Sequence, residues 1–237
     1  MNFHIVTLFP EAFESYTNAS IIGRALRDKK IKIKFYNPRD FTKDKHRRVD
    51  QKPYGGGPGM VLEAESVIKA VEAALKKITP SIPLNLRGKS KQQIKTSKLK
   101  PLSSKLIVWL SPSGEQFDNR VAQKYTKYTD IVIICGRYEG VDARVKKILR
   151  AKEISVGPYV LTGGELPAMV ILDTIARRIP GVLGKIESVE ENRVSSSEVY
   201  TRPAVLEYKG KKYRVPKVLL SGDHKKIEEW RNTQNKK

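Results

Sequence analysis

The stretch "EISVGPYVLTGGELPAMVILDTIARRIPGVLG", Glu153–Gly184, decides how we interpret the fold. Its middle part, Val156–Glu165, gathers three glycines around a single acid, and an almost wholly apolar helical pattern follows from Leu166. A phosphate-binding loop would place glycine beside Lys or at a helix N-terminus aimed at an anion, but the nearest downstream basic residues are Arg177 and Arg178. Because glycine has no Cβ, the stretch predicts close backbone approach to a group that need not be anionic.

Continuous apolar runs place this stretch in an α/β domain. "KLIVWL" (Lys105–Leu110) and "DIVIIC" (Asp130–Cys135) are typical of strands covered on both faces. Gly114–Tyr128 fits a connecting helix between them, and Leu62–Ile78 has the spacing of an amphipathic helix. Strand, helix and strand in this order predict a parallel sheet.

A glycine-bearing loop follows each of three predicted strands: "SPSGE", "GRYEGVD" and "GPYVLTGGE". Ligands of open parallel sheets bind at the carboxyl ends of the strands, so these loops predict one pocket. The apolar helix from Leu166, which we expect to end at Pro180, should be buried in the core or against a second subunit.

The charge balance is the strongest compositional signal. The 237 residues include 46 Lys and Arg against 25 Asp and Glu, a formal net charge of +21. This surplus favours a nucleic-acid partner over a merely basic soluble protein. No apolar run reaches the about 18 residues of a membrane span, and we expect a cytoplasmic protein without membrane contact. We expect Cys135 to be a buried small hydrophobe, and we expect no structural zinc site and assign no metal ligands, since the three His and the one Cys are scattered.

Two segments differ from the α/β pattern. Residues 86–105 carry seven basic residues and no acid, which indicates an inserted surface loop, an RNA-contacting arm, or both. The chain after Gly184 is polar and rich in Ser and Glu, as in an exposed linker. Beyond it we predict a turn at Lys209–Gly210 and a helix from His224. The predicted parts are an α/β domain, a linker and a small, mostly helical second domain: residues 1–184, 185–199 and 200–237.

Two further motifs carry candidate chemistry. "YGGGPGM", Tyr54–Met60, lacks the Lys-Ser/Thr of a P-loop, and we interpret it as a flexible loop or as a loop that closes over a flat ligand. "GRYEGVDARV", Gly136–Val145, places Glu139 at a predicted strand end. Its carboxylate is a candidate for binding an amine or a sulfonium, with a surface salt bridge as the alternative.

Seven motifs in one order resemble a known family. They are "YGGGPGM", "LSPSGEQFDNRVAQKY", "ICGRYEGVDARV", "SVGPYVLTGGELPAM", "ARRIPGVLG", "YTRPAVLEY" and "VPKVLLSGDHKKIEEWR". The chain, apart from residues 86–105, is similar to bacterial tRNA (guanine-N1)-methyltransferases, which methylate guanine 37 beside the anticodon. The resemblance implies the SPOUT fold, an α/β domain with a deep trefoil knot in its C-terminal part. It also implies a homodimer with two active sites at the interface, and S-adenosylmethionine bound in the knot.

The resemblance implies that the three loops bind this cofactor. The matching residues are Leu110, Ser111, Pro112 and Gly114; Gly136, Arg137, Tyr138, Glu139 and Gly140; and Ser155, Val156, Gly157, Tyr159, Leu161, Gly163 and Gly164. Pro158 stands where many relatives have an acid. The glycine cluster would then belong to the knot, where backbone passes backbone around a ligand that carries a sulfonium instead of phosphates.

Methyl transfer to N1 of guanine needs a general base for the N1 proton and a cation for the charge that moves onto O6. The resemblance gives the second role to Arg177. The family's base is an Asp in the linker, and motif counting places Asn192 there, whose amide cannot take a proton. Either Glu191 or Glu190 serves as base through a shifted linker, or the chain is a tRNA-binding protein that methylates slowly.

The second domain is expected to hold the anticodon stem-loop of tRNA. The residues that match the family there are Arg202, Ser221, His224 and Lys225. His224 is equally compatible with an ordinary residue at a helix N-terminus. A possible role for Mg²⁺ stays open. A ribose 2′-O-methyltransferase of the same fold is disfavoured, because "YTRPAVLEY" and "SGDH" belong to the resemblance with the guanine enzymes.

Overall fold

The computed structural model describes residues 1–78, 104–184 and 198–234. The chain forms two compact units, Met1–Val182 and Leu183–Lys237. Among the described residues, no helix combines the length and the apolar character that crossing a membrane requires.

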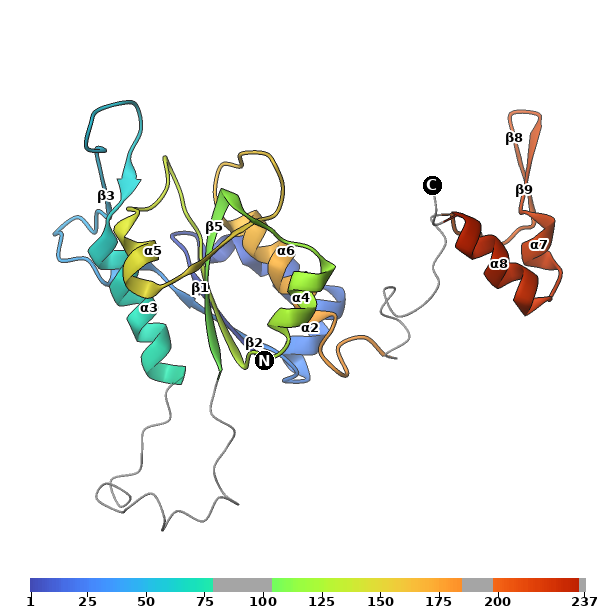
Figure 1. Cartoon of the computed structure of the whole chain (residues 1–237), viewed down its shortest axis with the longest axis horizontal. Coiled ribbons are helices and arrows are strands. Elements are labelled where there is room, and N and C mark those ends of the chain that lie inside the picture. The colour runs from blue at the N-terminus through green and yellow to red at the C-terminus, as the bar shows by residue number, and fades with distance from the viewer. Residues whose placement is uncertain (79–103, 185–197, 235–237) are drawn as a thin grey trace, which may run out of the picture. The chain divides into compact units, whose positions relative to one another are not determined.

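A five-stranded parallel sheet forms the centre of the first unit (Figure 1). The strands lie in the order β2-β1-β6-β5-β7. Their bounds are β1 Asn2–Val6, β2 Lys32–Tyr36, β5 Lys105–Gln116, β6 Asp130–Ile134 and β7 Lys152–Ser155. Every neighbouring pair is parallel, which confirms the predicted α/β sheet. The strands therefore end at one edge, where the segments that follow them lie together.

Alternate residues of a strand point to opposite sides of the sheet. Both sets are largely apolar here, so helices cover both faces of the sheet. Phe3, Ile5 and Ile133 pack into one core, whereas Val6 and Ile134 pack into the other. The first face carries α2 Ser20–Arg27, α4 Asn119–Tyr125 and α6 Glu165–Ala176, and the second carries α3 Ala64–Ile78 and α5 Arg144–Leu149 (Figure 1). The short elements are η1 Pro10–Phe13, α1 Glu14–Asn18, η2 Pro38–Asp40, β3 Asp50–Gln51 and β4 Val61–Leu62.

Strand β5 is longer than the predicted strand and continues through the "SPSGE" segment to Gln116. Leu110 and Glu115 both align with Ile154 of β7, so the residues between them bulge out of the ladder. A Cβ on Gly114 would lie 2.5 Å from the backbone nitrogen of Ile154. The prediction that the strand ends in a loop was therefore wrong: the strand bulges and then returns to β7 at close backbone distance.

Capping and pairing move the helix boundaries from their predicted places. The helix expected from residue 114 begins only after Asp118, whose carboxylate accepts a hydrogen bond of 2.8 Å from the Val121 N–H. The helix expected from Leu62 begins two residues later, because Leu62 belongs to β4. Helix α6 ends at Ala176, before Pro180, and the N–H groups of Arg178 and Ile179 bond three residues back, which tightens the last turn.

The second unit has almost no interior. Its described residues form the hairpin β8 Val205–Tyr208 and β9 Lys211–Arg214 and the helices α7 Lys217–Leu220 and α8 His224–Gln234. The turn at Lys209–Gly210 and the helix start at His224 are as predicted. None of the described residues of this unit is buried, as expected for so short a segment.

A buried polar cluster lies on the α3 side of the sheet. The two ring nitrogens of His4 lie 3.2 Å from the Tyr36 hydroxyl and 3.0 Å from the Asp130 carboxylate. Burial lowers the pKa of His4 despite the attraction of Asp130, and Lys34 and Lys77 lower it further. Burial alone would raise the pKa of Asp130, but hydrogen bonds from three neighbours outweigh it and keep that pKa below its ordinary value.

We expect the free energy of unfolding to fall as the pH drops below 6.5, the ordinary pKa of His4. The unfolded chain takes up a proton there, whereas the folded chain resists protonation until a lower pH. Protonation therefore favours the unfolded state, and the contribution of His4 is complete above pH 6.5 and lost on acidification. Asp130 acts in the same direction only below its ordinary pKa of 3.8.

Urea unfolding above and below pH 6.5, for wild type and His4→Gln, measures this contribution. The variant should be less stable overall, because it disturbs a buried cluster, but its stability should depend less on pH in this range. An identical pH dependence in both proteins would contradict the assignment to His4.

Candidate active site

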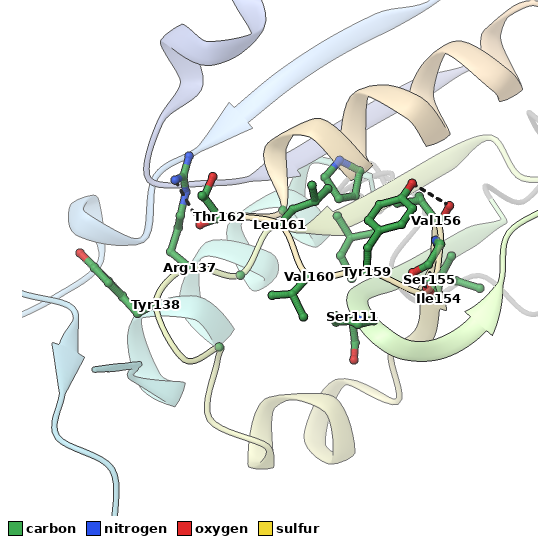
Figure 2. A pocket seen from close by; sticks show the side chains of 18 of the residues that line it. Ser111, Arg137, Tyr138, Ile154, Ser155, Val156, Tyr159, Val160, Leu161 and Thr162 are labelled. Atoms are coloured by element: carbon green, nitrogen blue, oxygen red, sulfur yellow. Dashed lines mark hydrogen bonds between the residues drawn. The ribbon is translucent and has the colours of Figure 1, made fainter. Parts of the chain in front are cut away.

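The bulge of β5 and the loops after β6 and β7 enclose a cavity of about 260 Å³ at the carboxyl edge of the sheet (Figure 2). Small-molecule pockets commonly measure roughly 300–1,000 Å³, so this cavity with its open side suits a small organic ligand. The structure brings together the residues of all three motifs there, apart from Gly114, which packs on β7. The lining residues are Leu110, Ser111, Pro112, Gly136, Arg137, Tyr138, Glu139, Gly140, Ser155, Val156, Gly157, Tyr159, Leu161, Gly163 and Gly164.

Four lining residues were missed by the sequence argument: Ile154, Val160, Thr162 and Pro167. The third loop curls around the cavity, so nearly every residue of the loop lines it, and not only those that match the family's motif. The available signal was the unbroken stretch itself, since Val160 and Thr162 lie between residues that the motif did select. Val160 and Leu161 are exposed and form an apolar rim (Figure 2).

The glycine cluster lets two loops touch through their backbones. The Gly164 N–H donates to the Gly136 carbonyl at 2.9 Å, and a Cβ on Gly164 would lie 2.6 Å from Cα of Cys135. A Cβ on Gly163 would lie 2.4 Å from Nε of Arg137. The close approach that the sequence predicted therefore occurs between the second and third loops, beside the cavity.

The glycine-rich motif at residues 54–60 adjoins the second loop. The Glu139 N–H donates to the Met60 carbonyl at 2.9 Å. Gly59 has a φ of +79°, and a Cβ there would lie 2.4 Å from Oε1 of Glu139. This turn therefore lies directly against the Glu139 carboxylate, which lines the cavity.

Cys135 lies next to the cavity but is suited to packing. Its side chain is buried, and burial together with the nearby Glu165 carboxylate raises the pKa of the thiol well above its ordinary value. A neutral thiol is a poor nucleophile, so the prediction of a buried small hydrophobe is confirmed.

Arg177 lies far from the cavity of its own chain. It caps the C-terminal end of α6, whereas the cavity adjoins the N-terminal end of this helix at Gly164 and Pro167. At 1.5 Å per residue, Gly164 and Arg177 are separated by about 20 Å along the axis. The structure thus does not bring the expected cation and the expected cofactor residues together within one chain. Glu191 and Asn192 lie outside the described residues.

The four residues expected to bind tRNA are all exposed on the second unit. Arg202 precedes β8, and the Ser221 hydroxyl stabilises the turn before α8. His224 and Lys225 open α8. Of the basic segment at 86–105, only the last two residues fall within the described ranges.

Comparison with known proteins identifies the family. The family model described as "tRNA (Guanine-1)-methyltransferase TrmD" matches residues 1–237. A tRNA (guanine-N(1)-)-methyltransferase of Pseudoalteromonas atlantica is 40% identical over 237 residues, which cover 98% of this chain and 79% of that protein. Relatives of the same name from Dictyoglomus turgidum and Clostridioides difficile are 43% and 40% identical, covering 97% and 99% of this chain and 83% and 92% of their own. The chain therefore belongs to the tRNA (guanine-N1)-methyltransferase family, and it is an enzyme that methylates a guanine of tRNA at N1.

Proposed function

We propose that the enzyme transfers the methyl group of S-adenosylmethionine to N1 of guanine 37, beside the tRNA anticodon. The observation that carries the proposal is the cavity at the carboxyl edge of the sheet, which is lined by the residues of the family's cofactor motifs. The proposal includes the trefoil knot of the SPOUT fold. The backbone contact between Gly136 and Gly164 supports it, because it joins two loops that a knot would thread past each other.

The lining fits S-adenosylmethionine chemically. Leu110, Ile154, Val156 and Leu161 offer apolar walls to a flat ring, and the glycines expose backbone N–H and C=O groups to its polar edge. The Glu139 carboxylate can balance the charge of a sulfonium. The bound cofactor would supply an electrophilic methyl group.

The remaining chemistry falls to two kinds of side chain. Arg177 is proposed to donate hydrogen bonds to O6 of guanine as negative charge moves onto that atom. A linker carboxylate, Glu191 or Glu190, is proposed to take the N1 proton, because the amide of Asn192 cannot accept it.

A homodimer would reconcile the position of Arg177 with this role. Leu166 and Val170 lie on one face of α6 and are 58% and 48% exposed. Large apolar side chains exposed in a row favour a second protein surface over water. We place the partner chain on this face, so that each cavity receives Arg177 of the partner subunit.

The second unit is proposed to hold the anticodon stem-loop. Arg202, His224 and Lys225 would contact phosphates while guanine 37 is swung out toward the methyl donor. The net charge of +21 supports this role, and a cytoplasmic location is proposed with it. A role for Mg²⁺ stays a prediction: residues 1–78, 104–184 and 198–234 contain no group of three His, Cys, Asp or Glu side chains that could hold a metal ion.

Single-turnover methyl transfer from labelled S-adenosylmethionine tests the proposal. The substrates are a tRNA transcript with guanine 37 and the same transcript with adenine 37, and wild type is compared with Glu191→Gln and Asn192→Asp. We expect only the guanine transcript to be methylated. Because general-base catalysis contributes roughly 10²- to 10⁴-fold, Glu191→Gln should slow transfer by at least about 100-fold if Glu191 is the base, and wild-type transfer in this variant would assign the base to Glu190.

The same experiment distinguishes an active methyltransferase from the alternative, a tRNA-binding protein that lacks the general base. Tight tRNA binding without methylation, rescued by Asn192→Asp, would establish that alternative. The named relatives at 40–43% identity support the enzyme instead.

A further inference from the structure

A buried acid without a role in the proposed chemistry lies behind the cavity wall. Glu165, the first residue of α6, is only 3% exposed. Its Oε1 accepts a hydrogen bond of 2.7 Å from the hydroxyl of Thr7, which is itself 1% exposed. Its Oε2 lies 2.9 Å from Nε of Arg137. A carboxylate at this depth has to be paired, so these contacts are a built arrangement.

The contact between Arg137 and Glu165 is an ion pair rather than a hydrogen bond. The two atoms are close, but neither Nε nor Oε2 has a partner in hydrogen-bond geometry among the described residues. The guanidinium is oriented by two other contacts. It lies 4.5 Å from the centre of the Phe9 ring, and Nη1 donates to the Thr162 carbonyl at 3.3 Å. Figure 2 shows the Arg137 side chain beside Thr162.

This junction joins three segments of the chain. Thr7 and Phe9 follow β1, Arg137 belongs to the second loop, and Thr162 belongs to the third. Gly163 allows the three to meet, because a Cβ there would lie 2.4 Å from Nε of Arg137 and 2.6 Å from Oε2 of the buried acid. The Arg137 side chain is thus engaged by protein groups on several sides.

We propose that Glu165 and Thr7 are positioning residues that fix Arg137 and, through the Thr162 carbonyl, hold the third loop in the shape that receives the cofactor. Neither Glu165 nor Thr7 lines the cavity, so both act through Arg137 and not by touching a ligand. The charge of Glu165 balances the guanidinium, and the Thr7 hydroxyl fixes the carboxylate. The effect on the cofactor rests on the proposed function of the cavity, whereas the hold on the third loop does not.

The first test measures binding of S-adenosylmethionine and of tRNA by titration calorimetry. Glu165→Gln keeps the side-chain shape and removes the charge, and should raise the Kd for S-adenosylmethionine about tenfold while leaving the Kd for tRNA unchanged. Thr7→Val should weaken cofactor binding in the same way, and Thr7→Ser, which keeps the hydroxyl, should bind as wild type does. Glu65→Gln is the matched control, since Glu65 makes an exposed surface pair with Lys69.

The second test needs no ligand. Amide hydrogen exchange in residues 156–164 should be about tenfold faster in Glu165→Gln, while residues 130–134 of the central strand keep the wild-type rate. Faster exchange in both segments would mean that Glu165 only supports the fold, and would overturn the proposal. Wild-type exchange and wild-type cofactor affinity would overturn it as well.

Other outcomes are equally decisive. If the wild-type enzyme bound no S-adenosylmethionine while residues 156–164 still exchanged faster in Glu165→Gln, the proposed function of the cavity would fail and the hold on the loop would stand. Should Glu165→Gln not fold, the pair Thr7→Val and Thr7→Ser carries the same comparison.

Discussion

Arg177→Ala is expected to lower the single-turnover rate of methyl transfer by about 100- to 1,000-fold, the usual loss when one donor to a developing oxyanion is removed. Binding of S-adenosylmethionine should fall far less, because the role proposed for Arg177 is toward O6 of guanine and not toward the cofactor, and within its own chain Arg177 lies at the end of α6 remote from the cavity. The fold should be retained, since the helix end is bonded there through backbone groups and not through the Arg177 side chain. Equal losses in methyl transfer and in cofactor binding would contradict the assigned role.

Mixed dimers test whether Arg177 acts across the subunit interface. One chain would carry Arg177→Ala with an intact cavity, and the other would carry Gly164→Ala, whose cavity is damaged. If each site combines the cavity of one chain with Arg177 of the partner subunit, one of the two sites in the mixed dimer is complete and activity returns. If both parts act within one chain, neither site is complete and the mixture stays inactive.

Gly164→Ala is expected to weaken binding of S-adenosylmethionine by about 5- to 100-fold, since overpacking of this kind costs about 1–3 kcal/mol and each 1.4 kcal/mol is tenfold in Kd. The added Cβ would lie 2.6 Å from Cα of Cys135 and 2.9 Å from the nitrogen of Gly136. Both are backbone atoms that cannot rotate away, so the second and third loops must separate at the cavity. Titration calorimetry with the cofactor measures the effect.

Gly184→Ala is the matched control for this substitution. Among residues 1–78, 104–184 and 198–234, no atom lies within 4 Å of a Cβ built on Gly184, so the same chemical change should leave cofactor binding at the wild-type level. Wild-type affinity in Gly164→Ala would show that the loops tolerate separation and that their backbone contact is not required for binding.

The parts of the fold that the sequence predicts correctly are those with local patterns. All residues of β6 are buried, and its unbroken apolar run predicts a strand covered on both faces. The bulge of β5 cannot be predicted from a local sequence pattern. Pro112 and Gly114 look like a loop locally, and only pairing with Ile154, far along the chain, returns the segment to the ladder.

The candidate site likewise has parts that a local pattern predicts and parts that depend on residues far apart in the sequence. Consecutive motif residues predict the cavity wall, because two of the three segments directly follow β6 and β7 and the other is the bulge within β5. The hydrogen bond between Thr7 and Glu165 joins positions 158 residues apart, and no spacing rule relates them. The distance between Arg177 and the cavity likewise depends on the length and direction of α6, which a motif match does not contain.

In the proposed homodimer, the length of α6 sets both the distance and the rotation about the helix axis between Gly164 and Arg177. One end of the helix belongs to the site of its own chain, and the other end to the site of the partner. A single inserted residue would lengthen it by only 1.5 Å but would rotate everything beyond by about 100°. Arg177 would then point away from its target, while every cavity contact at Gly164 remained intact. The enzyme can therefore vary the composition of this helix far more easily than the number of its residues.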